Sequence, residues 1–124
     1  MRYVCLIYNE KARLDAMPGS ERAAVAAEAL IYREELRRQG YFVAAEALQS
    51  AQTAMTVRVR NGRVSSTEGP TAETQEQLDG FVLIDARDLN EAIQVASKMP
   101  EAKVGSIEVR PISDHNRTDR WIRG

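Results

Sequence analysis

One segment near the end of the chain constrains the fold most, because it holds a strand, a helix and a second strand in close succession. Residues 81–86 form a short apolar run, Phe-Val-Leu-Ile-Asp-Ala, with the length and branching typical of a strand. Residues 89–99 place apolar side chains at helical spacing. Residues 104–110 alternate between apolar and polar side chains, which predicts a second strand. The short links between these runs indicate one strand–helix–strand unit.

Local signals also mark where these elements begin and end. Asp88 is a suitable N-cap for the helix, and Glu91 follows at the third helical position, as in a capping box. Pro100 should end the helix, because proline has no N–H to donate and its ring clashes with the preceding turn. Pro111 should end the last strand, because it cannot donate to a strand ladder.

The rest of the chain supplies the other expected elements. The first strand is apolar on both faces, which is typical of a central strand. The Asn61-Gly62 pair is the strongest short signal for a β-hairpin. The expected elements are strands at residues 2–8, 41–48, 54–60 and 63–67, a long helix capped by Ser20 and stopped by Gly40, a short polar helix at residues 71–78, and a polar loop at residues 9–19.

The order of the long elements predicts the fold class. With the hairpin and the short helix at residues 53–78 treated as an insertion, the order is βαββαβ, that of a ferredoxin-like α+β domain. We expect residues 1–111 to form this single domain. Residues 112–124 should form a C-terminal tail whose only anchors are Trp121 and Ile122.

The expected sheet has more apolar surface than two long helices can cover. The strands at residues 2–8 and 81–86 are apolar on both faces, whereas the helices of such a fold lie on one face. A large apolar face seldom stays exposed to water. We therefore expect a homodimer of the dimeric α+β barrel type, in which the sheets of two copies face each other.

Charge and cysteine content exclude several kinds of protein. A net charge of −1 gives no general attraction to nucleic acids or anionic membranes, and the strands lack the aromatic residues of RNA-binding sheets. No run approaches the roughly 20 apolar residues of a membrane span, and no signal peptide is visible. The single Cys5 fits a reducing compartment and should be a buried, inert thiol. We expect a cytoplasmic protein without nucleic-acid or membrane partners.

Several short motifs stand out along the chain: Glu68-Gly69-Pro70-Thr71, residues 72–76 (Ala-Glu-Thr-Gln-Glu), Asp79-Gly80-Phe81, Glu108-Val109-Arg110-Pro111, and residues 2–8 and 57–62. Together they resemble the YCII-related family, in particular its DGPF branch. The resemblance covers nearly the whole chain and implies the same fold and a sheet-to-sheet dimer. Glu68 and Thr71 depart from the Asp-Gly-Pro-Phe turn of that branch.

The resemblance also identifies chemistry that this chain lacks. Proteins of the family carry a His on the first long helix and an Asp just before the Pro that ends the second, a pair with the form of a base and its orienting acid. The matching positions here are Ala29 and Met99, and neither side chain can transfer a proton. The activity that depends on this dyad is therefore not expected here.

The remaining candidates for binding a ligand are polar or aromatic residues near strand ends and in the hairpin. They are Tyr8, Arg58, Arg60, Glu73 and Arg110. The hairpin arginines, including Arg63, have two open interpretations: ion pairs with neighbouring glutamates on a solvated surface, or an Arg fork that holds a small carboxylate or phosphate at the mouth of a cleft. Arg110 forms either a polar pair with Glu108 or part of a site. Tyr8 ends a central strand, so it is either a core or lining residue or one whose hydroxyl points into a pocket between helices and sheet and touches a ligand.

Motifs for metals and cofactors are missing. His115 is the only histidine, and it is either a solvated tail residue or one that reaches a partner's cleft. One His and one Cys are too few for a soft-metal site, and no phosphate-binding glycine motif occurs. We expect no metal and no cofactor.

Three functions stay open from the sequence. The first is a dimeric protein that binds a small ligand in a cleft without an acid–base dyad. The second is a cofactor-independent lyase or isomerase, which would use Glu73, Tyr8 or Arg58 in place of the dyad. The third is an accessory of sigma-factor regulation, which rests on the resemblance alone.

Overall fold

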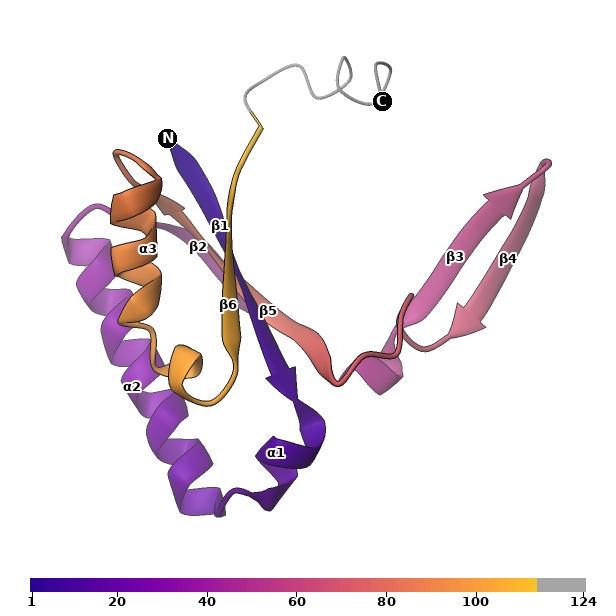
Figure 1. The fold of residues 1–124 in the computed structure, drawn as a ribbon, viewed down its shortest axis with the longest axis horizontal. Coiled ribbons are helices and arrows are strands. Elements are labelled where there is room, and N and C mark those ends of the chain that lie inside the picture. The colour runs from indigo at the N-terminus through magenta and orange to yellow at the C-terminus, as the bar shows by residue number, and fades with distance from the viewer. Residues whose placement is uncertain (114–124) are drawn as a thin grey trace.

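β1 (Arg2–Glu10) lies at the centre of the sheet in this computed structural model, which describes residues 1–113. It pairs antiparallel with β5 (Glu76–Asp85) on one side and β6 (Ser106–Pro111) on the other. β2 (Phe42–Ala47) joins β5, which completes the order β2-β5-β1-β6. The helices α2 (Gly19–Arg38) and α3 (Leu89–Ser97) cover one face (Figure 1). The chain therefore has the predicted ferredoxin-like α+β fold.

The two faces of β1 differ in what covers them. Tyr3, Cys5 and Ile7 point toward the helices and are at most 4% exposed. Val4 and Leu6 alternate with them and lie on the opposite face, where they are half-buried. This alternation places the hydrophobic core between the sheet and α2 and α3.

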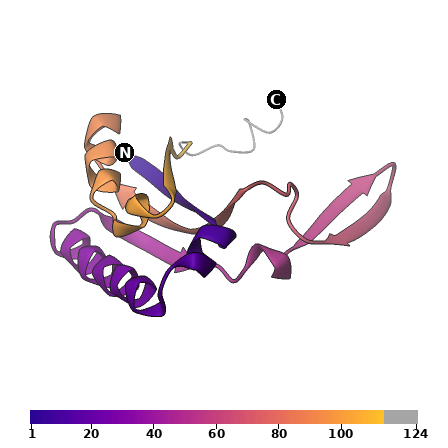
Figure 2. The ribbon, with the colours of Figure 1, turned by 60° about the horizontal axis from the view of Figure 1, so that its bottom comes forward.

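The opposite face of the sheet, which we call the open face, carries apolar side chains without a covering helix. Leu6 lies opposite Phe81, and Val4 lies opposite Leu83. In the described part of the chain, α2 and α3 both lie on the other side of the sheet (Figures 1 and 2). The excess of apolar surface predicted from the sequence is therefore present in the structure.

The long helix α2 has the predicted apolar stripe but a different start. Ala29 and Leu36 are buried, and Tyr32 packs against the core. The helix begins after Pro18, so the prediction of a Ser20 N-cap is wrong. The N-cap residue Pro18 makes no side-chain cap, and its carbonyl accepts hydrogen bonds from the N–H groups of Glu21 and Arg22. Gly40 has a φ of 83°, which suits the residue after a helix end.

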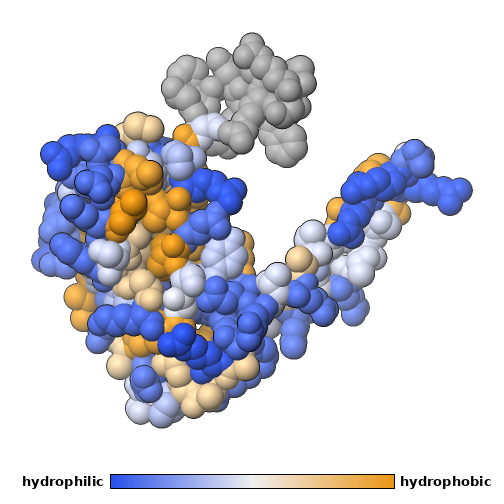
Figure 3. Space-filling view, in the orientation of Figure 1, coloured by the Kyte–Doolittle hydropathy of each residue, from blue (hydrophilic) through white to orange (hydrophobic). Residues whose placement is uncertain are grey.

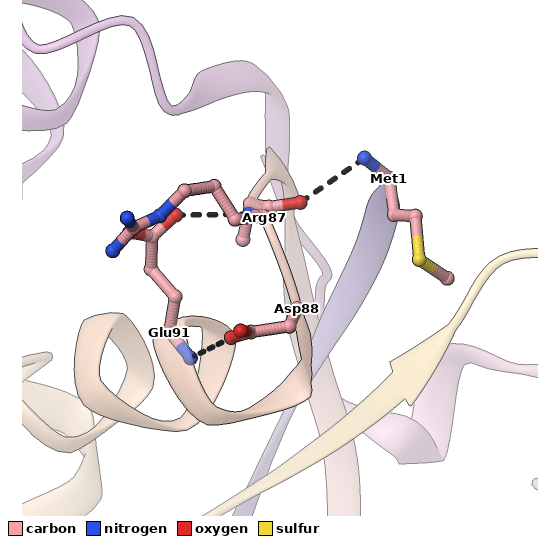
Figure 4. Close-up of polar contacts among 5 residues, drawn as sticks. Met1, Arg87, Asp88 and Glu91 are labelled. Carbon is pink, nitrogen blue, oxygen red and sulfur yellow. Dashed lines mark hydrogen bonds and ion pairs between the residues drawn. The ribbon is translucent and has the colours of Figure 1, made fainter.

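The α3 helix begins with the predicted cap (Figure 4). The Asp88 carboxylate accepts a hydrogen bond of 2.9 Å from the Glu91 N–H. The Glu91 carboxylate reaches back to the N–H of Arg87 at 2.9 Å, one residue earlier than in a standard capping box. The helix ends at Ser97, and Pro100 opens the 3₁₀ turn η2 (Pro100–Lys103).

The predicted hairpin is a separate two-stranded sheet that projects from the body of the molecule (Figures 1 and 2). It consists of β3 (Met55–Arg60) and β4 (Arg63–Glu68). Asn61 and Gly62 have φ values of 52° and 75°, as a type I′ turn requires. We call residues 55–68 the arm.

Two predictions for the shorter segments are wrong. Residues 71–78 do not form a helix; β5 instead begins at Glu76, because Gln77 and Glu76 pair with the end of β1. Strand pairing with β1 therefore outweighs the local helical signal. The expected loop at residues 9–19 contains α1 (Lys11–Ala16), which a Lys11–Asp15 ion pair of 2.7 Å supports.

Some expectations cannot be compared with the structure. His115 and the tail anchors Trp121 and Ile122 lie outside the described residues. Within residues 1–113, no helix is long and apolar enough to cross a membrane.

Candidate functional site

A cleft of about 540 Å³ lies at the base of the arm. The end of β1, α1 and the start of α2 form part of its wall. The start of β5 and the two segments that connect the arm to the body form the rest, and one of these segments contains η1 (Ala51–Thr53). We call residues 48–54 and 69–75 the arm connectors.

A hydrogen-bonded pair fixes the inner wall of the cleft. The Asn9 amide donates to the Asp79 carboxylate at 2.7 Å, which joins the end of β1 to the start of β5. A bulge in the β1–β5 pairing lies just before Asn9 and turns the strand end. Gly105 packs against the same place, where a Cβ atom would overlap the Tyr8 carbonyl oxygen and the Asn9 side chain.

The charges at the mouth of the cleft are only partly neutralised. Lys11 and Asp15 form an ion pair with each other. Arg22, from α2, and Glu73, from an arm connector, form no ion pair with any other described residue. The cleft therefore offers one free cation and one free carboxylate beside the apolar side chains of Leu14 and Leu78.

A glutamine holds the connector that carries Glu73. The Gln77 amide donates to the backbone oxygens of Ala72 and Thr74, each at 3.0 Å. These bonds connect residues 72–74 to the start of β5, although the expected helix at residues 71–78 does not form. The sequence pattern had indicated a Thr74–Gln77 capping box, and the two residues do contact each other.

Of the five candidate ligand-binding residues, Glu73 lines the cleft. Tyr8 pairs with Ser106 on the open face, away from the space between helices and sheet. Arg110 forms an ion pair with Glu108 on β6. Arg58 and Arg60 lie on the arm, outside the cleft wall.

The structure excludes one of the two interpretations of the hairpin arginines, and the Arg fork stays a prediction. Arg60 lies directly opposite Arg63, and Arg58 lies on the same side of the arm. Among residues 1–113, these three arginines form no ion pair. Pairing with neighbouring glutamates is therefore wrong, and the cluster is an uncompensated basic surface.

Sequence reasoning missed Asn9, Asp79 and Arg22. Asn9 follows the predicted first strand and Asp79 precedes Gly80, so both stood beside recognised elements. No local pattern indicated that they would meet, because their contact depends on the β1–β5 register.

The positions of the family's dyad are filled by packed apolar side chains. Ala29 is 7% exposed and Met99 is 2% exposed. The same two elements are joined by an ion pair between Arg33 and Glu101 at 3.2 Å, with both side chains largely buried. This region links α2 to η2 and has no acid–base pair at the two matching positions.

Two weak acids, the buried Cys5 thiol and the half-buried Tyr32 hydroxyl, keep their protons at neutral pH. Burial raises the pKa of the Cys5 thiol to about 11, so it is not a nucleophile. Burial, with a smaller effect of the Glu35 charge, raises the pKa of Tyr32 to about 12. The Tyr32 hydroxyl donates to the Val95 carbonyl at 2.7 Å and joins α2 to α3. Both groups are structural.

No cluster of three or more metal-ligating side chains occurs in the described part of the chain. The cleft itself offers Asn9, Asp15, Glu73 and Asp79 as oxygen ligands, but Asp15 and Asp79 already have partners.

Comparison with known proteins identifies the family. A family model described as YCII-related domain matches residues 1–116. The chain belongs to the YCII-related family. A relative of this YCII-related chain is the uncharacterised protein R00369 of Rhizobium meliloti (strain 1021), with 33% identity over 115 residues, or 91% of this chain and 93% of that protein.

A solved structure shares the YCII-related fold seen here. It is the 5-chloro-2-hydroxyhydroquinone dehydrochlorinase TftG from Burkholderia phenoliruptrix AC1100, in complex with 2,5-dihydroxybenzoquinone. The TM-score is 0.57, with 13% sequence identity, over 94% of this chain and 98% of the other. At this identity the likeness concerns the fold.

Proposed function

We propose that this YCII-related protein binds a small organic ligand in the cleft at the base of the arm. The observation that carries the proposal is the combination of a free Arg22 cation and a free Glu73 carboxylate in one cleft. The buried Ala29 and Met99 speak against catalysis by the family's dyad. The motif at residues 68–71 is compatible with the DGPF branch, which stays a prediction.

The lining of the cleft favours a flat, oxygenated ligand. Arg22 suits an acidic oxygen, Glu73 suits a hydroxyl, and Leu14 and Leu78 suit a ring. TftG, which has the same fold, is in complex with such a compound, 2,5-dihydroxybenzoquinone. This compound is therefore a suitable first probe.

Calorimetric titration with 2,5-dihydroxybenzoquinone and hydroxylated benzoates tests the proposal. We expect binding by the wild type and at least a fivefold weaker affinity for Arg22→Ala and for Glu73→Gln. Arg38→Ala, an exposed arginine outside the cleft, is the control and should not change the affinity. If the wild type binds none of these compounds, or if the control has the same effect as the cleft variants, the proposal is wrong.

A second candidate is an enzyme that acts on a small molecule without a cofactor. Glu73 supports it, because an unpaired carboxylate in a cleft can accept a proton. The dehydrochlorinase activity named for TftG makes the loss of halide from a hydroxylated ring a suitable assay. Halide release that Glu73→Gln abolishes would favour this candidate over binding alone.

We also propose that the protein is a homodimer in which the open faces of two sheets meet. The half-buried apolar side chains of Val4, Leu6, Phe81 and Leu83 on that face support it. Light scattering at low micromolar concentration should show twice the 13.9 kDa mass of the chain, and Leu83→Asp should shift it to 13.9 kDa. Circular dichroism checks that the variant is folded. A monomeric wild type would reject the dimer.

A further inference from the structure

The two sides of the arm have opposite chemical character. Val59 lies directly opposite Val64, and Met55 and Val57 lie on the same side of β3. All four side chains are largely exposed: Met55 by 55%, Val57 by 63%, Val59 by 56% and Val64 by 73%. Arg58, Arg60 and Arg63 occupy the other side. Figure 3 shows hydrophobic side chains among the basic ones on the projecting arm.

An arm of this kind needs a contact outside its own two strands. An isolated two-stranded hairpin is at best marginally stable in water. The arm is tied to the body at its base, where the Gly69 N–H donates to the Ala54 carbonyl at 2.7 Å and the Thr56 hydroxyl donates to the Gly69 carbonyl at 2.8 Å. Beyond the base it extends away from the body (Figures 1 and 2).

The position of the arm favours a second copy of this chain as the surface that it contacts. The arm and the helices lie on opposite sides of the sheet (Figure 1), so a second copy on the open face would lie within reach of the arm. The apolar side of the arm would face this second copy, whereas Arg58, Arg60 and Arg63 lie on the other side and stay toward the solvent.

The arm cannot form the dimer alone. A standard interface uses roughly 20–30 residues from each partner, and the apolar side of the arm provides only Met55, Val57, Val59 and Val64. Its contact must therefore add to a larger one, which the open face of the sheet can supply. This step rests on the homodimer proposed above.

We propose that the apolar side of the arm packs on a second copy of the chain and thereby holds one wall of the cleft in place. Both arm connectors line the cleft, through Ser50 and Gln52 on one side and Pro70 and Glu73 on the other. Gly69, where the arm meets its second connector, is bonded to the other side of the base: its N–H donates to the Ala54 carbonyl and its carbonyl accepts from the Thr56 hydroxyl, so a displacement of the arm also moves this connector. Docking of the arm therefore fixes the position of Glu73.

Two variants on neighbouring positions of β4 test this. Val64→Asp places a charge on the apolar side, and Ser65→Asp places the same charge on the arginine side. Sedimentation equilibrium should show at least a tenfold weaker dimer for Val64→Asp and no weakening for Ser65→Asp. Hydrogen exchange should be faster at residues 69–75 in Val64→Asp than in Ser65→Asp.

The results separate this proposal from those on which it rests. If Leu83→Asp dissociates the dimer while Val64→Asp does not, the sheet interface stands and the docked arm is wrong. If both variants weaken the dimer but residues 69–75 exchange equally in the two β4 variants, the link to the cleft is wrong. The ligand titrations use neither variant, so their outcome is independent.

Discussion

Cys5 shows how a single residue of this protein responds to its surroundings. It is fully buried between β1 and the helices, and burial raises its thiol pKa from 9.0 to about 11. The folded state therefore holds the thiol proton more tightly than the unfolded chain does. Its contribution to stability is complete below pH 9 and is lost as the pH rises toward 11.

We predict that Cys5→Ala reduces the loss of stability between pH 9 and 11 by about 2 kcal/mol, because each pKa unit corresponds to about 1.4 kcal/mol and the thiol of the folded protein is only half ionised at pH 11. Urea unfolding at several pH values measures this. The charge of the Cys5 thiolate also raises the Tyr32 pKa, so Cys5→Ala weakens this second effect in the same direction. Parallel pH profiles for the variant and the wild type would contradict the prediction.

Gly105 is a second residue whose surroundings determine what it can be. Its Cα packs against the Tyr8 carbonyl and the Asn9 side chain, where a Cβ atom would overlap both. Gly105→Ala should lower the free energy of unfolding by about 1–3 kcal/mol, as overpacking does. Gly19→Ala is the control, because the nearest atom to its Cβ would be the flexible end of Arg22 at 3.9 Å. Equal stability of the two variants would disprove the close contact.

Among the elements, α3 is the one whose sequence signals and structure agree best. Asp88 caps the helix through the Glu91 N–H, and Arg87 donates two hydrogen bonds to the Glu91 carboxylate, from its backbone N–H and its guanidinium. The backbone bond, followed by the side-chain bond, lowers the Glu91 pKa. The ionised Glu91 therefore stabilises the folded state at pH values above the usual pKa of a glutamate. This contribution is lost as the pH falls through the lowered pKa of the folded state.

We predict that Asp88→Ala lowers the free energy of unfolding by about 1 kcal/mol, because the first turn of α3 loses its cap. Asp88→Asn should keep most of the stability, since an Asn side chain can accept the same hydrogen bond. Denaturant unfolding at neutral pH distinguishes the two. Equal losses for Asn and Ala would show that the charge of Asp88, and not its hydrogen bond to the helix, is what matters.

At the scale of the whole molecule, the body and the arm are built differently. The body has a core between one sheet face and two helices, and the arm has no buried hydrophobic side chain. The Gly69 N–H and the Ala54 carbonyl meet at the base of the arm, so a short link can join these positions.

Replacing residues 55–68 with a short glycine link should therefore leave the body folded. We expect a cooperative thermal transition and a largely retained helical signal in circular dichroism, together with a weaker dimer in sedimentation. An unfolded or insoluble product would contradict this division, because it would make the arm part of the folded core.

The sequence by itself determined the strand–helix–strand unit, the hairpin turn and the order βαββαβ, because these depend on local spacing, caps and turn residues. The two-sided apolar character of β1 was also readable from residues 2–8. The tertiary structure alone decided that residues 71–78 are not a helix, since pairing with β1 extends β5 to Glu76. It also brought Asn9 to Asp79 and separated Arg58 from Glu73, because such contacts depend on strand register and on the direction in which the arm leaves the body.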